Sequence, residues 1–164
     1  MFKIFNNFLT DEDLLEFEEI VNRSQWKYTG FSRNRNTMFW KLDVHDENFI
    51  KNVMDKLESR VNKKFEVLRV YANGQTYGQD GEYHTDSKDE GAYTLLIYIS
   101  EITPLNVKYI GGYTQFLLDG MVTGVEPYIK RAVFFDSRIE HRGTAPLNKN
   151  ILRVSLTFKL KEVK

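Results

Sequence analysis

The chain has 164 residues, which is the size of one ordinary domain with a substantial core. Its 23 basic and 23 acidic residues balance, so no overall field draws the protein to nucleic acid or to a membrane surface. The absence of cysteine excludes disulfides, thiolate nucleophiles and cysteine-ligated zinc or iron–sulfur sites. No stretch reaches the roughly 18 apolar residues of a transmembrane helix, and the first residues do not resemble a signal peptide. We therefore expect a cytoplasmic globular protein.

Two amphipathic helices are predicted in the first part of the chain. Thr10 is followed three residues later by Asp13, which is typical of a capped helix start with acidic residues in its first turn. Apolar residues then recur at helical spacing, which predicts a helix over 11–23. The same spacing predicts a second helix over 46–62.

Between these helices, residues 26–41 mix basic and aromatic side chains. The pattern is typical of a polar hairpin or loop whose aromatic side chains return to the core. The alternative is a mobile basic–aromatic flap over a pocket. The candidates for contact with a primary substrate are Arg33, Arg35 and Trp40 in this segment.

After the second helix the apolar pattern changes to short β-rich runs. The run 93–100 is almost continuously apolar, which indicates a strand buried on both faces. Two helices followed by many short strands predict an α+β protein, mainly β, with helices packed on a sandwich or barrel. We expect a single domain over 1–164, with helical support over about 1–64 and a β core over about 65–160. The strands are predicted at 2–8, 65–71, 83–86, 93–100, 113–118, 132–136 and 151–160.

His84 and Asp86 lie two residues apart in a predicted strand, so their side chains would share one face. His141 follows the β-rich run 131–136 and is the candidate for a third metal ligand. Two imidazoles and one carboxylate on one side of a metal leave other positions open, which suits non-haem Fe(II) that must bind a co-substrate and O₂. The alternatives are a surface ion pair, a hydrogen-bonded core histidine, or the ligands of a zinc hydrolase.

Arg153 begins the last predicted strand, where it shares a face with Ser155 and Thr157. An unpaired buried guanidinium is costly, so this side chain must find an anion or reach solvent. A salt bridge or an edge position would satisfy it. Beside an iron site, a bidentate contact with a substrate carboxylate would satisfy it equally well.

An ordered series of motifs over roughly 65–160 resembles the Fe(II)- and 2-oxoglutarate-dependent dioxygenases, and among them the prolyl 4-hydroxylase-like group. The resemblance implies a double-stranded β-helix, a jelly roll of two facing sheets, supported by the two N-terminal helices. In chain order the motifs are Tyr71-x-x-Gly74-Gln75-x-Tyr77, His84-x-Asp86, Ile97-Tyr98-Ile99-Ser100, Gly111-Gly112-x-Thr114-x-Phe116, Pro127, Arg131-Ala132-Val133-Phe134-Phe135-Asp136, His141-Arg142-Gly143-Thr144-Ala145-Pro146 and Arg153-Val154-Ser155-Leu156.

The resemblance also implies that the three candidate ligands bind Fe(II), with 2-oxoglutarate and O₂ as co-substrates. Arg153 matches the basic residue that pairs with the distal carboxylate of 2-oxoglutarate. Tyr71 matches a tyrosine that packs against the co-substrate, and Tyr98 matches a strand tyrosine that reaches the distal carboxylate. The implied reaction hydroxylates an unactivated C–H bond and releases succinate and CO₂.

For the primary substrate we expect a prolyl residue in a peptide or protein, recognised by the rim of the domain. The alternatives are the same chemistry on another amino acid, a nucleobase or a small metabolite, including demethylation. A catalytically silent jelly roll that binds a ligand or partner is a further alternative. We expect no membrane or nucleic-acid partner, and the sequence does not indicate an oligomeric state.

Overall fold

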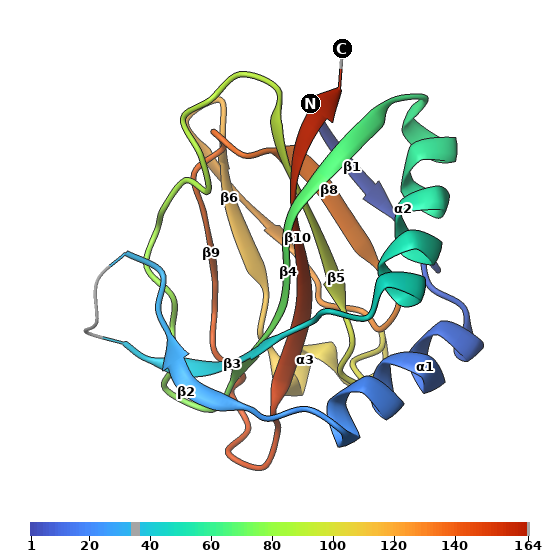
Figure 1. Ribbon diagram of the computed structural model, residues 1–164. Coiled ribbons are helices and arrows are strands. Elements are labelled where there is room, and N and C mark those ends of the chain that lie inside the picture. The colour runs from blue at the N-terminus through green and yellow to red at the C-terminus, as the bar shows by residue number, and fades with distance from the viewer. Residues whose placement is uncertain (34–36, 164) are drawn as a thin grey trace.

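Two antiparallel sheets form the framework of the protein in this computed structural model, which describes residues 1–33 and 37–163 (Figure 1). The 7-stranded sheet has the order β1-β8-β5-β10-β4-β3-β2, and the 3-stranded sheet has the order β7-β6-β9. The strands are β1 (Phe2–Phe5), β2 (Lys27–Gly30), β3 (Phe39–Asp43), β4 (Lys64–Gln75), β5 (Ala92–Tyr98), β6 (Thr114–Leu118), β7 (Met121–Val125), β8 (Ala132–Asp136), β9 (His141–Gly143) and β10 (Arg153–Val163). Apolar residues of both sheets pack together, so the predicted jelly roll is confirmed.

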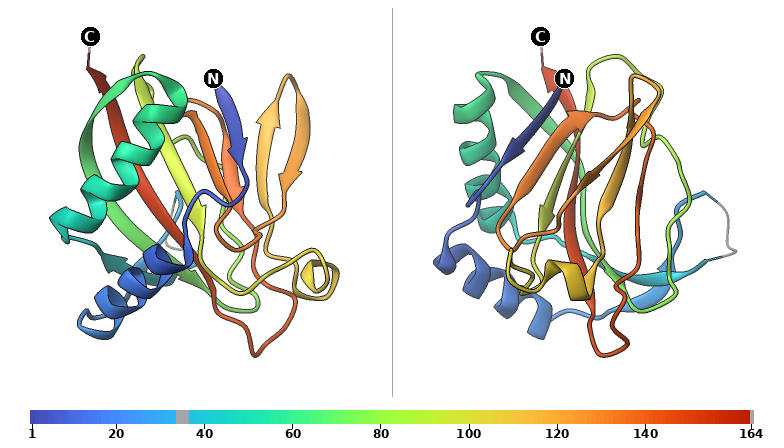
Figure 2. Two further views of the ribbon diagram at one scale, coloured as in Figure 1. Left: turned by 90° about the vertical axis from the view of Figure 1, so that its right-hand side faces the viewer. Right: turned by 180° about the vertical axis from the view of Figure 1, so that it is seen from behind.

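The two predicted helices are α1 (Asp11–Asn22) and α2 (Glu47–Val61), and each begins at a capping side chain. Thr10 forms a reciprocal capping box with Asp13, while Asp46 accepts a hydrogen bond from the Phe49 amide. In Figure 2 both helices lie on one side of the large sheet, and the small sheet lies on the other side. No helix in the described ranges is both long enough and apolar enough to cross a membrane, and the cytoplasmic location stays a prediction.

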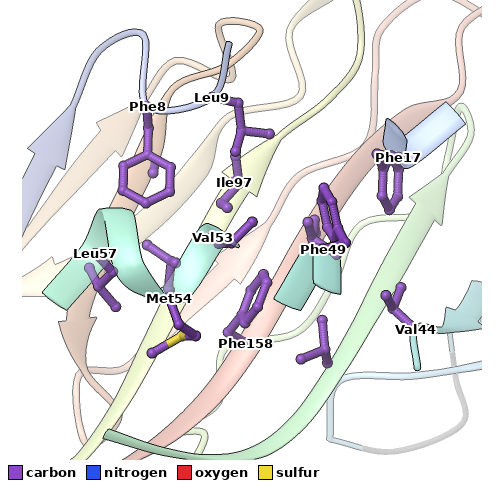
Figure 3. Packing of buried hydrophobic residues seen from close by; sticks show 14 of the residues in the cluster. Phe8, Leu9, Phe17, Val44, Phe49, Val53, Met54, Leu57, Ile97 and Phe158 are labelled. Carbon is purple, nitrogen blue, oxygen red and sulfur yellow. The ribbon is translucent and has the colours of Figure 1, made fainter. Parts of the chain in front are cut away.

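The period of two along the central strands separates the hydrophobic core from a polar cavity. Leu156, Phe158 and Leu160 of β10 belong to the main core, and Figure 3 shows Phe158 beside Val53 and Met54 of α2. The alternate residues of β10 line a cavity on the opposite face, and β4 follows the same alternation. On β10 the cavity-lining side chains are Arg153, Ser155, Thr157 and Lys159; on β4 they are Arg69, Tyr71, Asn73 and Gln75. The prediction that Arg153, Ser155 and Thr157 share a face is confirmed.

Some predicted elements differ from the structure. The strand expected over 83–86 is wrong, because only His84 pairs with a neighbouring segment, through an isolated bridge to His141. The Asp86 amide instead donates to the Ser137 carbonyl, which draws the chain out of the strand register. The strands β7 and β9 and the short helix α3 (Val107–Ile110) were not predicted. Before residue 64 the structure has the strand expected over 2–8, as β1, and the strands β2 and β3 in the segment where a hairpin or loop was expected.

Segment 26–41 forms much of the antiparallel β2–β3 hairpin, which extends the large sheet beyond β4 (Figure 1). Thr29, Gly30, Phe39 and Lys41 of this hairpin line the cavity. The hairpin therefore forms part of the cavity wall, as the flap hypothesis expected; its mobility stays a prediction.

We expect the core between α2 and the large sheet to dominate stability. Leu57 is 0% exposed in this core, whereas Leu15 on α1 is 61% exposed. Leu57→Ala should lower the free energy of unfolding by about 2–5 kcal/mol, because it leaves a cavity among packed side chains. The matched control Leu15→Ala should change it by less than about 0.5 kcal/mol. Urea denaturation of both variants checks this, and equal losses would contradict the assignment of the core.

Candidate metal and co-substrate site

His84, Asp86 and His141 come together at one end of the cavity. The backbones of the two histidines exchange hydrogen bonds of 3.0 and 2.9 Å, which brings their rings to a centroid distance of 4.6 Å. His84 Nε2 lies 3.4 Å from Asp86 Oδ1, and His141 Nε2 lies 3.6 Å from Asp86 Oδ2. One donor atom from each of the three residues lies within 4.8 Å of the others. The structure thus assembles the set of side chains that the sequence suggested.

Backbone carbonyls orient both imidazole rings. His84 Nδ1 lies 2.9 Å from the Glu82 carbonyl, and His141 Nδ1 lies 3.0 Å from the Ile139 carbonyl. A carbonyl oxygen only accepts, so each Nδ1 carries the hydrogen and each Nε2 presents its lone pair to the shared space. Burial lowers the pKa of His141 to about 4, which favours the neutral ring that a metal requires.

Asp86 is held as a carboxylate with one oxygen engaged. Its side chain is 5% exposed, and its Oδ2 accepts a 2.6 Å hydrogen bond from Thr94 Oγ1 and contacts Lys159 Nζ. Burial by itself would raise the pKa of Asp86, but the contact with His84 and the charge of Lys159 outweigh burial and hold the pKa well below its usual range. Because Thr94 and Lys159 both engage Oδ2, Oδ1 is left to face His84.

This donor set fits a non-haem iron centre. Two imidazole nitrogens and one carboxylate oxygen converge from one side, as in the facial arrangement that leaves coordination positions open for substrates. The Nδ1–carbonyl hydrogen bonds are the outer contacts that commonly fix metal-binding histidines.

Arg153 lines the same cavity and is 2% exposed. Its guanidinium donates to the Gly112 carbonyl at 2.6 Å, to Gln75 Oε1 at 2.8 Å and to Thr114 Oγ1 at 2.9 Å. These partners are neutral, and no carboxylate within residues 1–33 and 37–163 forms an ion pair with it. Burial removes water from the charged guanidinium and so lowers the pKa of Arg153. A buried cation with neutral neighbours fits an anionic ligand in this cavity.

Gly112 gives Arg153 its position. Its φ of +77° lies in the left-handed region that favours glycine, and an added Cβ would lie 3.0 Å from Arg153 Cδ. Gly111, the residue before it, also has a positive φ.

Thr114 is a site residue whose role the sequence reasoning missed, although the residue lies in one of the motifs. Its Oγ1 accepts from Arg153 and, at 2.8 Å, from the hydroxyl of Tyr98. A hydroxyl accepts at most two hydrogen bonds, so the hydrogen of Thr114 is left to donate to a ligand in the cavity that it lines. Tyr98 itself is buried behind Thr114 rather than among the residues that line the cavity.

Tyr71 lines the cavity wall next to β10, where it pairs in register with Thr157. Burial raises the pKa of Tyr71, so its phenol stays neutral. Asn73, two residues along the same strand, has a buried Oδ1 atom without a hydrogen-bond partner among the described residues.

The cavity has a volume of about 320 Å³, and part of its wall comes from the β2–β3 hairpin. Arg33 and Trp40 belong to the hairpin segment but do not line the cavity, and Arg35 lies outside the described residues. The alternation of β3 turns Lys41 toward the cavity while Trp40 packs on Tyr28 at 5.2 Å. Contact of Arg33, Arg35 and Trp40 with a substrate therefore stays a prediction.

Comparison with family models found no match, and a search of curated proteins found none either. Among solved structures, a prolyl hydroxylase from Trichoplax adhaerens, in complex with a peptide fragment of a hypoxia-inducible factor, matches with a TM-score of 0.78 and 20% identity. That match covers 98% of this chain and 83% of the other. A viral collagen prolyl hydroxylase from Paramecium bursaria Chlorella virus-1, in a 2-oxoglutarate complex, matches with a TM-score of 0.71 and 17% identity, over 99% and 96% of the two chains.

The α-ketoglutarate-dependent epimerase SnoN from nogalamycin biosynthesis also matches, with a TM-score of 0.73 and 9% identity over 98% of this chain and 76% of the other. Proteins with different reactions in their names thus share this architecture. The chain has the fold of the 2-oxoglutarate- and iron-dependent oxygenases, as its motifs led us to expect.

Proposed function

We propose that this protein is an Fe(II)- and 2-oxoglutarate-dependent oxygenase. The observation that carries the proposal is the presence, in one cavity, of an open two-histidine, one-carboxylate donor set and a buried arginine without a carboxylate partner in the described residues. A zinc hydrolase accounts for the donor set but gives no reason for a buried guanidinium beside it. A silent binding module gives no reason for three ligand side chains whose free atoms converge.

The contacts of each residue suit it to one role. His84 and His141 through Nε2, and Asp86 through Oδ1, would hold the iron. Arg153 would bind the distal carboxylate of 2-oxoglutarate, and the hydroxyl of Thr114 would add a second donor. Tyr71 packs beside the co-substrate, while Tyr98 acts through Thr114.

The bound iron and 2-oxoglutarate supply the oxidising chemistry that activates O₂ and releases succinate and CO₂. The chain itself orients both substrates and excludes water. Leu96, Phe135 and Phe39 give the cavity apolar wall, which limits competing reactions with solvent.

For the primary substrate we propose hydroxylation of an unactivated C–H bond, with a prolyl residue as the leading candidate. The support is the likeness to two structures named as prolyl hydroxylases, at 20% and 17% identity. Substrate choice resides in the wall around the iron rather than in the fold, and the epimerase with the same architecture illustrates this. The substrate is a peptide or a small molecule, and the domain spans residues 1–164.

Thermal unfolding tests the site directly. Metal-free protein should be stabilised by Mn(II) or Fe(II) without oxygen, and 2-oxoglutarate should add to this only when metal is present. A ligand at about a hundred times its dissociation constant adds roughly 2.7 kcal/mol, which is readily measured. His84→Ala should remove the metal-dependent shift. A shift with metal but none with 2-oxoglutarate would contradict the role of Arg153, and no shift with either would leave the binding-module alternative.

Arg153→Lys should separate co-substrate binding from metal binding. Lysine keeps a charge but loses the planar fork, so the 2-oxoglutarate concentration for half-maximal stabilisation should rise roughly 10- to 100-fold. The stabilisation by Mn(II) alone should not change. Arg142→Lys is the matched control, because Arg142 binds Gln115 and does not line the cavity. Equal effects of the two substitutions would argue against a specific carboxylate contact.

A further inference from the structure

Three cations of the cavity wall surround the ring of Tyr71. Arg69 Cζ lies 5.1 Å, Lys41 Nζ 5.4 Å and Lys159 Nζ 5.8 Å from the ring centroid. They come from the adjacent strands β4, β3 and β10, and all three line the cavity. Like charges gathered this closely repel one another, so their arrangement requires anions nearby.

The carboxylates beside these cations compensate them incompletely. Lys41 Nζ at 2.9 Å and Arg69 Nη2 at 3.2 Å share one oxygen of Asp43. Lys159 pairs with Asp86, which is the candidate metal ligand. Asp43 is therefore shared by two cations, and Asp86 would be shared by Lys159 and the metal.

The imbalance persists in the loaded site, and this step rests on the proposed function. The charges of Fe(II) and 2-oxoglutarate cancel, so Asp43 and Asp86 still face the four cations Arg153, Lys41, Arg69 and Lys159. Two positive charges of the wall therefore exceed the carboxylates that contact them among the described residues. The side chain of Lys159 is only 20% exposed, so an uncompensated charge there is costly.

Space for a further anion lies next to Lys159. A second cavity of about 320 Å³ shares Arg69, Tyr71, Asp86 and Lys159 with the first, so the lysine stands where the two cavities meet.

We propose that the primary substrate carries a carboxylate, and that Lys159, assisted by Lys41 and Arg69, binds it beside the iron site. Two sources present this chemistry: the free carboxylate of an amino acid and the side chain of an acidic residue next to the target in a peptide.

The test measures binding by titration calorimetry to protein loaded with Mn(II) and 2-oxoglutarate without oxygen. The probes are matched carboxylates and carboxamides: L-proline with L-prolinamide, and acetyl-Asp-Pro-amide with acetyl-Asn-Pro-amide. In at least one pair the carboxylate should bind about tenfold more tightly than the amide, because it forms a charge-assisted contact. The pair that discriminates identifies the source of the carboxylate. Equal affinity for the carboxylate and the amide in both pairs, or no binding of any probe, overturns the proposal.

Lys159→Met tests the residue assignment, since it keeps the length of the side chain and removes its charge. The preference for the carboxylate should fall to near unity in this variant, while the stabilisation by Mn(II) with 2-oxoglutarate persists. Lys88→Met is the control: Lys88 is exposed, lies two residues after Asp86 in the sequence and lines neither cavity. This variant should keep the preference for the carboxylate. A preference that survives Lys159→Met overturns the assignment.

A second variant covers the case in which Lys159→Met does not fold. Arg69 is half exposed, so Arg69→Gln should fold and lower the preference by about two- to fourfold. An unchanged preference in Arg69→Gln would then count against the proposal. Stabilisation by 2-oxoglutarate is measured in the same samples. If it is present without discrimination, the substrate proposal alone fails; if it is absent, the proposed function fails as well.

Discussion

The register of β10 between β4 and β5 is the constraint on which core and site both depend. Pairing runs over the whole of β10, with Arg153 opposite Gln75 and Lys159 opposite Arg69. One face of the strand supplies leucine and phenylalanine to the core, and the other supplies Arg153 and Lys159 to the cavity. A slip by one residue would exchange these faces, burying two cations among the helices and exposing the core residues to the cavity. The burial of apolar side chains therefore fixes the positions of the polar ones.

The three candidate metal ligands are held unequally by the backbone. His141 lies in β9, which pairs with β6, whereas His84 meets His141 through an isolated bridge and the Asp86 amide donates to the Ser137 carbonyl. Few backbone contacts hold the segment of His84 and Asp86, yet the side chains converge because carbonyls fix both rings and Thr94 and Lys159 hold the carboxylate. A metal that joins all three would add the constraint that the backbone lacks, since binding energy at such a site also stabilises the fold around it.

Hydrophobic periodicity predicted the helices that bury one face and the strand that is buried on both faces. The helices end within about two residues of their expected bounds, and all seven residues of β5 are buried, as its apolar run indicated. The strand β7 was missed because four of its five residues are exposed and show no alternation, although Asp119-Gly120 before it, both with positive φ, is a hairpin signal. Lys159 was missed because a charged residue late in a strand is usually exposed. The alternation that singled out Arg153 also selects Lys159, six residues further on.

Chemistry and specificity come from different parts of the chain. The candidate metal ligands, Arg153 and Thr114 lie in the part of the chain that runs from β4 to β10. Proteins whose names give different reactions share this architecture. Part of the remaining wall comes from the β2–β3 hairpin, where the alternation of side chains along β3 turns Lys41, and not Trp40, toward the cavity. The pairing of Lys41 with Asn73 on β4 fixes which side chains face the cavity, and no local sequence pattern reveals this long-range contact. Fold likeness therefore bears on the architecture alone, whereas the unbalanced charges around Tyr71 bear on the proposed substrate, because they are a property of these side chains and not of the architecture.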